Sequence, residues 1–97
     1  MTEEEKVLHE IYRLVKGDKS MMHLPVSPVT VSQGTGLTVE QVLACCKTLV
    51  NHGYLTGTGS TSFPPYFYIT KLGISAAQSP KPALYIYTAP VNARKRA

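Results

Sequence analysis

The sequence has little cysteine and no long apolar stretch. Its two cysteines, Cys45 and Cys46, are adjacent and include no CxxC pair for zinc. Neighbouring side chains on a helix point about 100° apart, which makes them poor disulfide partners. No apolar run, such as Val42 to Cys46, exceeds five residues, which is too short for a signal peptide or a membrane span. We therefore expect a cytoplasmic protein with one core thiol, no metal site and no membrane contact.

Groups suited to catalysis are also scarce. Asp18 is the only aspartate, and the three histidines, His9, His23 and His52, fall in three different predicted elements. The sequence has no Ser/His/Asp order, paired carboxylates or phosphate loop. The sequence therefore predicts a protein that is not an enzyme and needs no cofactor.

Acidic residues are missing from the second half of the chain. Residues 53–97 carry five cations and no acid, whereas the whole chain has a net charge of +4. Such a basic half suits a polyanionic partner, although three of its cations lie in the last four residues. At 97 residues the chain has room for one domain, which we place at residues 1–90. We expect residues 91–97 to be a basic disordered tail.

The first helix has a clear start. Thr2 and Glu5 have the spacing of a capping box, and Gly17 is expected to end the helix. Its apolar face is predicted from helical spacing to comprise Val7, Leu8, Ile11, Leu14 and Val15. Prolines then favour extended backbone, and a short strand is predicted near Met22 to Leu24.

Two further helices are predicted on either side of a glycine turn. The first covers Val29 to Gln33, with Ser27 as cap and Pro28 at its first position, and stops at the turn Gly34-Thr35-Gly36. The second begins after Thr38, which pairs with Gln41 in another capping box, and continues to His52. Its apolar stripe contains Val42, Cys46, Leu49 and Gly53, widened by Val39, Leu43 and Val50. Its opposite face carries Glu40, Gln41, Ala44, Lys47, Thr48 and Asn51.

The remaining pattern is typical of strands. Aromatic and β-branched residues at 54–56 and 66–70 flank a glycine-, serine- and proline-rich loop, which predicts a β-hairpin. Thr70 is suited to cap a short helix at 71–78. Residues 83–88 alternate as a further strand does, with Tyr85 and Tyr87 on one face.

This order of elements resembles the winged-helix (winged helix-turn-helix) family of DNA-binding domains. The resemblance spans about residues 4–78 and is carried by Val31, Gly36-Leu37-Thr38, Val42, Cys46, Leu49, Gly53-Tyr54-Leu55 and Tyr68-Ile69-Thr70-Lys71-Leu72-Gly73. It implies an α+β fold with a three-helix core and a hairpin wing. We expect the short fourth helix and the C-terminal strand to be additions to that core.

The resemblance also implies a function, which is binding of double-stranded DNA, as in a small transcriptional regulator. The helix beginning at Thr38 would lie in the major groove. Gln41 would bind an adenine edge, and Lys47 would contact phosphate or guanine. The implied DNA-binding residues are Ser32, Gln33, Thr38, Glu40, Gln41, Ala44, Lys47, Thr48, Thr58 and Ser60.

The hairpin tip departs from the family pattern. Residues 57–65 contain no Lys or Arg, although phosphate neutralisation supplies most nonspecific affinity. We therefore expect a homodimer that reads two half-sites. Alternatively, the hydroxyls and backbone amides of the tip could contact phosphate without formal charge. The alternative is a winged-helix protein-interaction module with little or no DNA affinity. The predicted strand at 83–88 supports this alternative, because it could join another chain's sheet or close a dimer. The same strand could instead pair within its own sheet or pack on the first helix.

Overall fold

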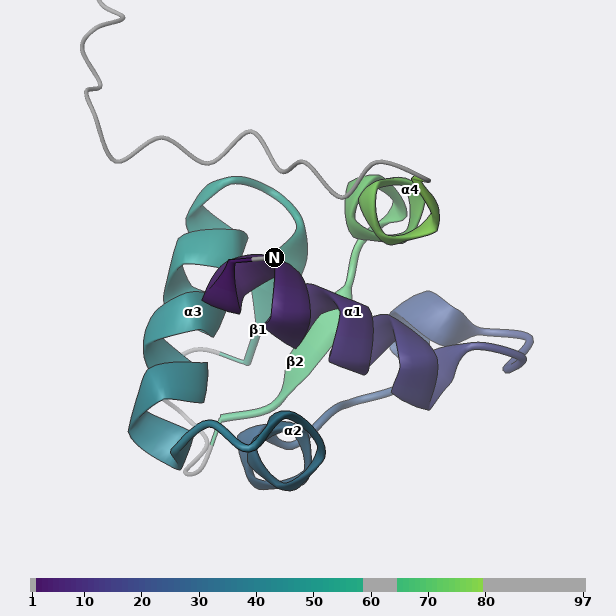
Figure 1. Cartoon of the computed structure of the whole chain (residues 1–97). Helices are drawn as coiled ribbons and strands as arrows, with labels where there is room; N and C mark the ends of the chain where they lie inside the picture. The colour runs from purple at the N-terminus through teal and green to yellow at the C-terminus, as the bar shows by residue number, and fades with distance from the viewer. Residues whose placement is uncertain (1, 59–64, 80–97) are drawn as a thin grey trace, which may run out of the picture.

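The computed structural model describes residues 2–58 and 65–79, and Figure 1 shows the arrangement of their helices and strands. Their order is α1 (Glu3–Val15), the 3-10 helix η1 (Met21–His23), α2 (Pro28–Thr35), α3 (Val39–Asn51), β1 (Leu55–Gly57), β2 (Phe67–Ile69) and α4 (Lys71–Gln78). Within these residues the fold is α+β, with four α-helices and a two-stranded antiparallel hairpin, an arrangement compatible with a winged helix. The predicted strand at 83–88, the tail at 91–97 and Ser60 lie outside the described residues.

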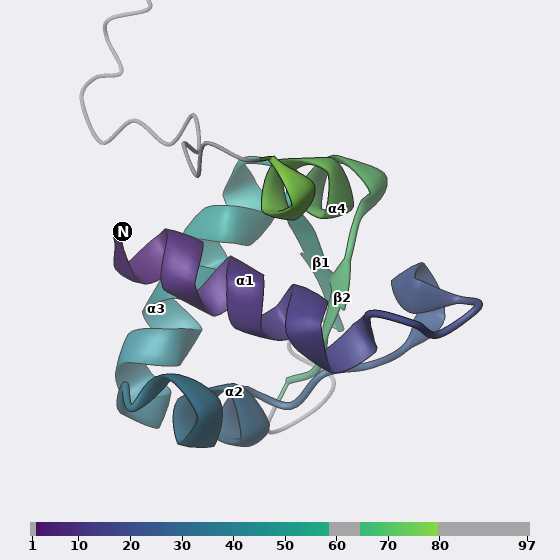
Figure 2. The same cartoon turned by 45° about the vertical axis from the view of Figure 1, so that its right-hand side comes forward.

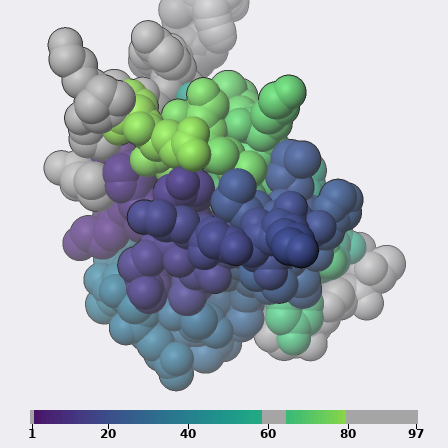
Figure 3. All heavy atoms as spheres, turned by 90° about the vertical axis from the view of Figure 1, so that its right-hand side faces the viewer, coloured from purple at the N-terminus to yellow at the C-terminus, as the bar shows by residue number. Residues whose placement is uncertain are grey.

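Helix α1 crosses the middle of the molecule, with α2 on one side and α4 on the other (Figures 1 and 2). The space-filling view, turned by 90° from Figure 1, shows the same order, with α1 between α2 and α4 (Figure 3). The predicted capping box is confirmed, because Thr2 Oγ1 accepts from the Glu5 amide at 3.1 Å and Glu5 Oε1 accepts from the Thr2 amide at 2.9 Å. The helix ends two residues before Gly17, and its buried apolar residues are Val7, Leu8, Ile11 and Val15.

The prediction of a strand near Met22 to Leu24 is wrong. Residues Met21–His23 form η1, and the extended pairing comes two residues after Leu24, at Val26. The Val26 amide donates to the Phe67 carbonyl at 2.8 Å and the Phe67 amide donates to the Val26 carbonyl at 3.0 Å. Val26 is β-branched and retains an N–H that the neighbouring proline lacks, which makes it the better strand residue.

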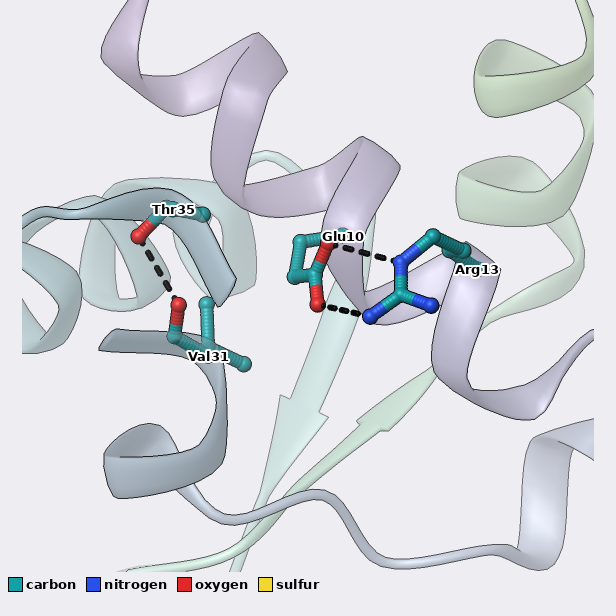
Figure 4. Close-up of polar contacts among 4 residues, drawn as sticks. All are labelled: Glu10, Arg13, Val31 and Thr35. Carbon is teal, nitrogen blue, oxygen red and sulfur yellow. Dashed lines mark hydrogen bonds and ion pairs between the residues drawn. The ribbon is translucent and has the colours of Figure 1, made fainter. Parts of the chain in front are cut away.

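Helix α2 ends at Thr35, within the predicted turn Gly34-Thr35-Gly36 and two residues after Gln33, and Gly36 follows in the left-handed conformation (φ 79°). Gly34 lies against α1, where a Cβ would meet the Glu10 carboxylate. Arg13 holds that carboxylate through Nε at 3.0 Å and Nη2 at 2.6 Å (Figure 4). The contact lets α1 and α2 cross closely, and the start of α3 depends on where α2 ends.

The core lies between helices α1, α2 and α3 and the hairpin. Its buried apolar residues are Val7, Leu8, Ile11, Val15, Val26, Val31, Val42, Cys45, Cys46, Leu49, Tyr54, Leu55, Phe67 and Ile69. Both thiols are buried, so the expectation of one core thiol is wrong. Helix α3 packs against α1. Its buried residues include Cys45 in addition to the predicted Val42, Cys46 and Leu49.

Burial also sets the chemistry of the two thiols. It raises the pKa of Cys45 to about 11, with a further contribution from the carboxylates of Glu4 and Glu3. It raises the pKa of Cys46 to about 12, with a smaller contribution from Cys45. Both thiols are therefore protonated near neutral pH and are poor nucleophiles.

The hairpin leads directly into α4. Strand β1 pairs with β2 in the register Leu55↔Ile69, Thr56↔Tyr68 and Gly57↔Phe67. Thr70 caps α4 as predicted, since its Oγ1 accepts from the Gly73 amide at 3.0 Å, and it donates to the Gly53 carbonyl at 2.6 Å. In the part of the chain that the structure describes, no helix has the length and apolar character to cross a membrane.

Candidate nucleic-acid interface

The turn between α2 and α3 is fixed by side-chain hydroxyls. Ser32 donates to the Leu37 carbonyl at 2.6 Å. Thr35 donates to the Val31 carbonyl at 2.8 Å (Figure 4) and accepts from the Leu37 amide at 3.2 Å. With Gly36 supplying the left-handed residue, these bonds define how the chain leaves α2 and enters α3.

A capping box then starts α3. The Gln41 amide donates to Thr38 Oγ1 at 3.1 Å, and Gln41 Oε1 accepts from the Thr38 amide at 2.9 Å. Leu37, just before the cap, packs against the core. The first turn of α3 is therefore held from both sides, and the direction of its exposed surface follows from the turn that precedes it.

Helix α3 lies along one side of the molecule (Figure 1), and its outward side is polar. Val42, Cys45, Cys46 and Leu49 point into the core. We call the opposite side the polar face of α3, which comprises Glu40, Gln41, Ala44, Lys47, Thr48 and Asn51. All of these residues are exposed except Thr48, which is half-buried.

Hydrogen bonds within the fold limit what some predicted contact residues can offer DNA. The hydroxyl protons of Ser32 and Thr48 are used, by the Leu37 carbonyl at 2.6 Å and by the Ala44 carbonyl at 3.3 Å. Each hydroxyl could still accept a bond but not donate one to a phosphate in this arrangement. The hydroxyl of Thr38 accepts from Gln41, and its proton remains available.

Gln41 also belongs to the capping box of α3, which constrains how its side chain could bind an adenine edge. Bidentate recognition of adenine needs the amide oxygen as acceptor and the amide NH₂ as donor. The oxygen of Gln41 already accepts from the Thr38 amide. That oxygen keeps a second lone pair, so the cap fixes the orientation of the Gln41 side chain without removing its acceptor, and the NH₂ group remains a donor.

Asn51 is a further polar group that the implied set of contact residues leaves out. It is exposed, lies one turn after Lys47 on the same face, and its amide has no bond to another residue in the described ranges 2–58 and 65–79. The helical wheel already placed it on this face.

The polar face carries one charge of each sign. Lys47 is the only cation of α3 and Glu40 its only acid, and they are seven residues apart, about 10 Å along the helix. Neither has an ion pair within residues 2–58 and 65–79. Glu40 lies in the first turn, where it complements the helix dipole but would repel a phosphate.

Two further predicted residues, Gln33 and Thr58, lie outside α3. Gln33 is exposed on α2. Thr58 follows β1 and its Oγ1 accepts from the Tyr66 amide at 3.1 Å.

In the described part of the chain no group of three His, Cys, Asp or Glu residues is placed to hold a metal ion.

Comparison with known proteins gave no relative. A scan against protein-family models found no match, and searches of the curated proteins and of the solved structures found none either.

Proposed function

We propose that this chain is a winged-helix domain that binds double-stranded DNA, as a small transcriptional regulator does. The observation that carries the proposal is the presentation of α3. Its capped first turn follows a hydroxyl-fixed turn from α2, and its exposed surface carries Thr38, Gln41 and Lys47. A helix held in this way, with a hairpin after it, has the form that enters a major groove.

Donors on this surface suit a duplex in different ways. The ammonium of Lys47 and the hydroxyl of Thr38 are suited to phosphates, and the NH₂ groups of Gln41 and Asn51 to acceptors on base edges. With one cation on α3, a single copy neutralises few phosphates. We therefore propose that a homodimer binds, with two copies of α3 on two half-sites.

The test is titration of a labelled duplex with the protein at low and at physiological salt, followed by fluorescence anisotropy. Binding that weakens steeply as salt rises is expected, because phosphate contacts release counterions. Sedimentation of the protein–duplex complex gives the number of copies bound. Absence of binding at low salt would refute the proposal.

A second candidate is a protein-interaction module, which the balance of charge on the polar face favours. Glu40 offsets Lys47 there, so the face has no net charge. This alternative predicts no affinity for a duplex at any salt concentration and an association with a protein that salt affects little.

A further inference from the structure

A groove separates α3 from the hairpin. It has a volume of about 600 Å³ and is lined by Leu43, Lys47, Val50, Asn51, Gly57, Pro65 and Phe67. This volume lies within the range of small-molecule sites, about 300–1,000 Å³. An apolar crevice beside Leu14 and Leu24 is smaller, about 230 Å³, and a pocket of about 490 Å³ between α1 and α2 is lined mostly by polar residues.

The walls of the groove are mostly apolar. Leu43 and Val50 come from α3 and are half-buried, Pro65 is half-buried, and Phe67 of β2 is buried. These side chains suit a hydrocarbon or an aromatic ring, but not a sugar–phosphate backbone, which would lose its hydration there.

Two polar groups, Lys47 and Asn51, meet at one rim of the groove. They are four residues apart and therefore adjacent on the helix surface. One supplies an ammonium and the other an NH₂ group, and neither is bonded to another side chain within residues 2–58 and 65–79. Together they form a donor pair suited to the two oxygens of a carboxylate.

The chain itself supplies no side-chain carboxylate to this rim from its second half. All six acids of the sequence lie between Glu3 and Glu40, so residues 41–97 contain none. Glu40 is about two helical turns from Lys47. The charge of Lys47 beside an apolar groove is therefore complementary to an external acid.

We propose that this groove binds a small apolar carboxylic acid. Its carboxylate accepts hydrogen bonds from Lys47 and Asn51, and its ring or branched chain packs on Leu43, Val50 and Phe67. A bound acid neutralises the one cation of the polar face and so weakens DNA binding. That consequence rests on the proposed function, whereas binding of the acid does not.

The test uses naphthylacetate and its neutral amide, naphthylacetamide, as matched probes. Two-dimensional amide NMR spectra of the full chain are recorded during titration with each probe. The acid is expected to bind about tenfold more tightly than the amide, as one charge-assisted hydrogen bond predicts. Shifted signals are expected at residues 43–51, Gly57 and Phe67. Equal affinity for the two probes, or shifts confined to α1 and α2, would overturn the proposal.

Variants separate the roles of charge and shape. Lys47→Met keeps the alkyl stem and is expected to bind acid and amide equally, whereas Lys6→Met on α1 should keep the preference for the acid. Asn51→Asp places a carboxylate at the rim and should weaken binding of the acid but not of the amide. An unchanged preference in Lys47→Met would overturn the assignment. So would concentration-dependent shifts of the same signals without probe, because they would place a second copy in the groove.

A duplex titration with and without the probes tests the consequence. The acid, but not the amide, is expected to weaken duplex binding by the wild-type chain. If the acid binds as described and no duplex binds at any salt concentration, the groove assignment stands and the DNA proposal fails. If the duplex binds and neither probe does, the reverse holds.

Discussion

Gly73 of α4 lies directly against the carbonyl oxygen of Tyr54, the residue that leads into β1. A Cβ at position 73 would meet that backbone oxygen and would also come within 2.8 Å of Ile69 Cγ1. Because the neighbour is backbone, it has no rotamer by which to move away. Helix α4 therefore packs against the hairpin through a residue that has no side chain.

Replacing Gly73 by alanine is expected to destabilise the fold, although alanine is the better helix former. Overpacking of this kind costs about 1–3 kcal/mol, which urea unfolding followed by circular dichroism can measure. Ser75→Ala is the matched control, since Ser75 is exposed on the same helix; it should change stability by less than about 0.5 kcal/mol. A neutral or stabilising Gly73→Ala would show that α4 does not pack on Tyr54 in this way.

Gln41 should separate capping from DNA binding. Gln41→Glu keeps the oxygen that accepts from the Thr38 amide and places an acid at a helix N-terminus, so stability should be retained. It removes the NH₂ group, so duplex affinity should fall. Gln41→Ala should lose both the affinity and about 0.5–1 kcal/mol of stability. Thermal melts and anisotropy titrations of the two variants test this; full duplex affinity in Gln41→Glu would remove Gln41 from the interface.

Glu40 is expected to oppose DNA binding. Glu40→Gln removes a negative charge from the polar face and should tighten duplex binding by about threefold at low salt. It should also cost about 0.3–1 kcal/mol through loss of the favourable dipole interaction. Glu3→Gln makes the same change in the first turn of α1 and should leave duplex affinity unaltered. Tighter binding in both variants would point to a general charge effect rather than to this face.

Alkaline pH should unfold the protein through its thiols. The ordinary thiol pKa is 9.0, and burial raises the pKa of Cys45 to about 11 and that of Cys46 to about 12. Below pH 9 both thiols stay protonated in the folded and in the unfolded state, so they do not change the free energy of unfolding. Above it the unfolded state releases them first, and the free energy of unfolding falls as pH rises toward 11–12.

Urea unfolding of the wild type and of Cys46→Ala at several alkaline pH values measures this dependence. The variant should show a shallower decline than the wild type. Equal slopes would contradict a contribution of the Cys46 thiol to the pH dependence. At neutral pH a thiol-specific reagent should react slowly with both cysteines in the folded chain and quickly in urea.

Local signals in the sequence predicted the helix starts well. The capping boxes at Thr2 and Thr38 and the cap at Thr70 are all present, because each depends on residues within one turn. The hairpin followed from its β-branched and aromatic residues. The C-terminal strand, the tail, Ser60 and the domain boundary at 90 stay predictions, as does the resemblance to the winged-helix family.

The sequence was misleading where the outcome depends on distant residues. The two glycines of the predicted turn Gly34-Thr35-Gly36 look alike in the sequence, but only Gly36 is left-handed, whereas Gly34 is helical and lies against the Glu10 carboxylate of α1. Cys45 lies outside the predicted apolar stripe of α3, yet it is buried. For the candidate site, helical periodicity identified the exposed face of α3. It could not show that the hydroxyls of Ser32 and Thr48 donate to backbone carbonyls.

The measurement that tests the central claim most directly is the salt dependence of duplex binding for the wild type, Lys47→Met and Lys6→Met. If Lys47 contacts a phosphate, its loss should reduce the slope of log K against log salt by about 1 per bound copy. Lys6→Met, on α1, should leave the slope unchanged. Identical slopes for Lys47→Met and the wild type, or a smaller slope in Lys6→Met alone, would contradict the claim that α3 presents its polar face to DNA.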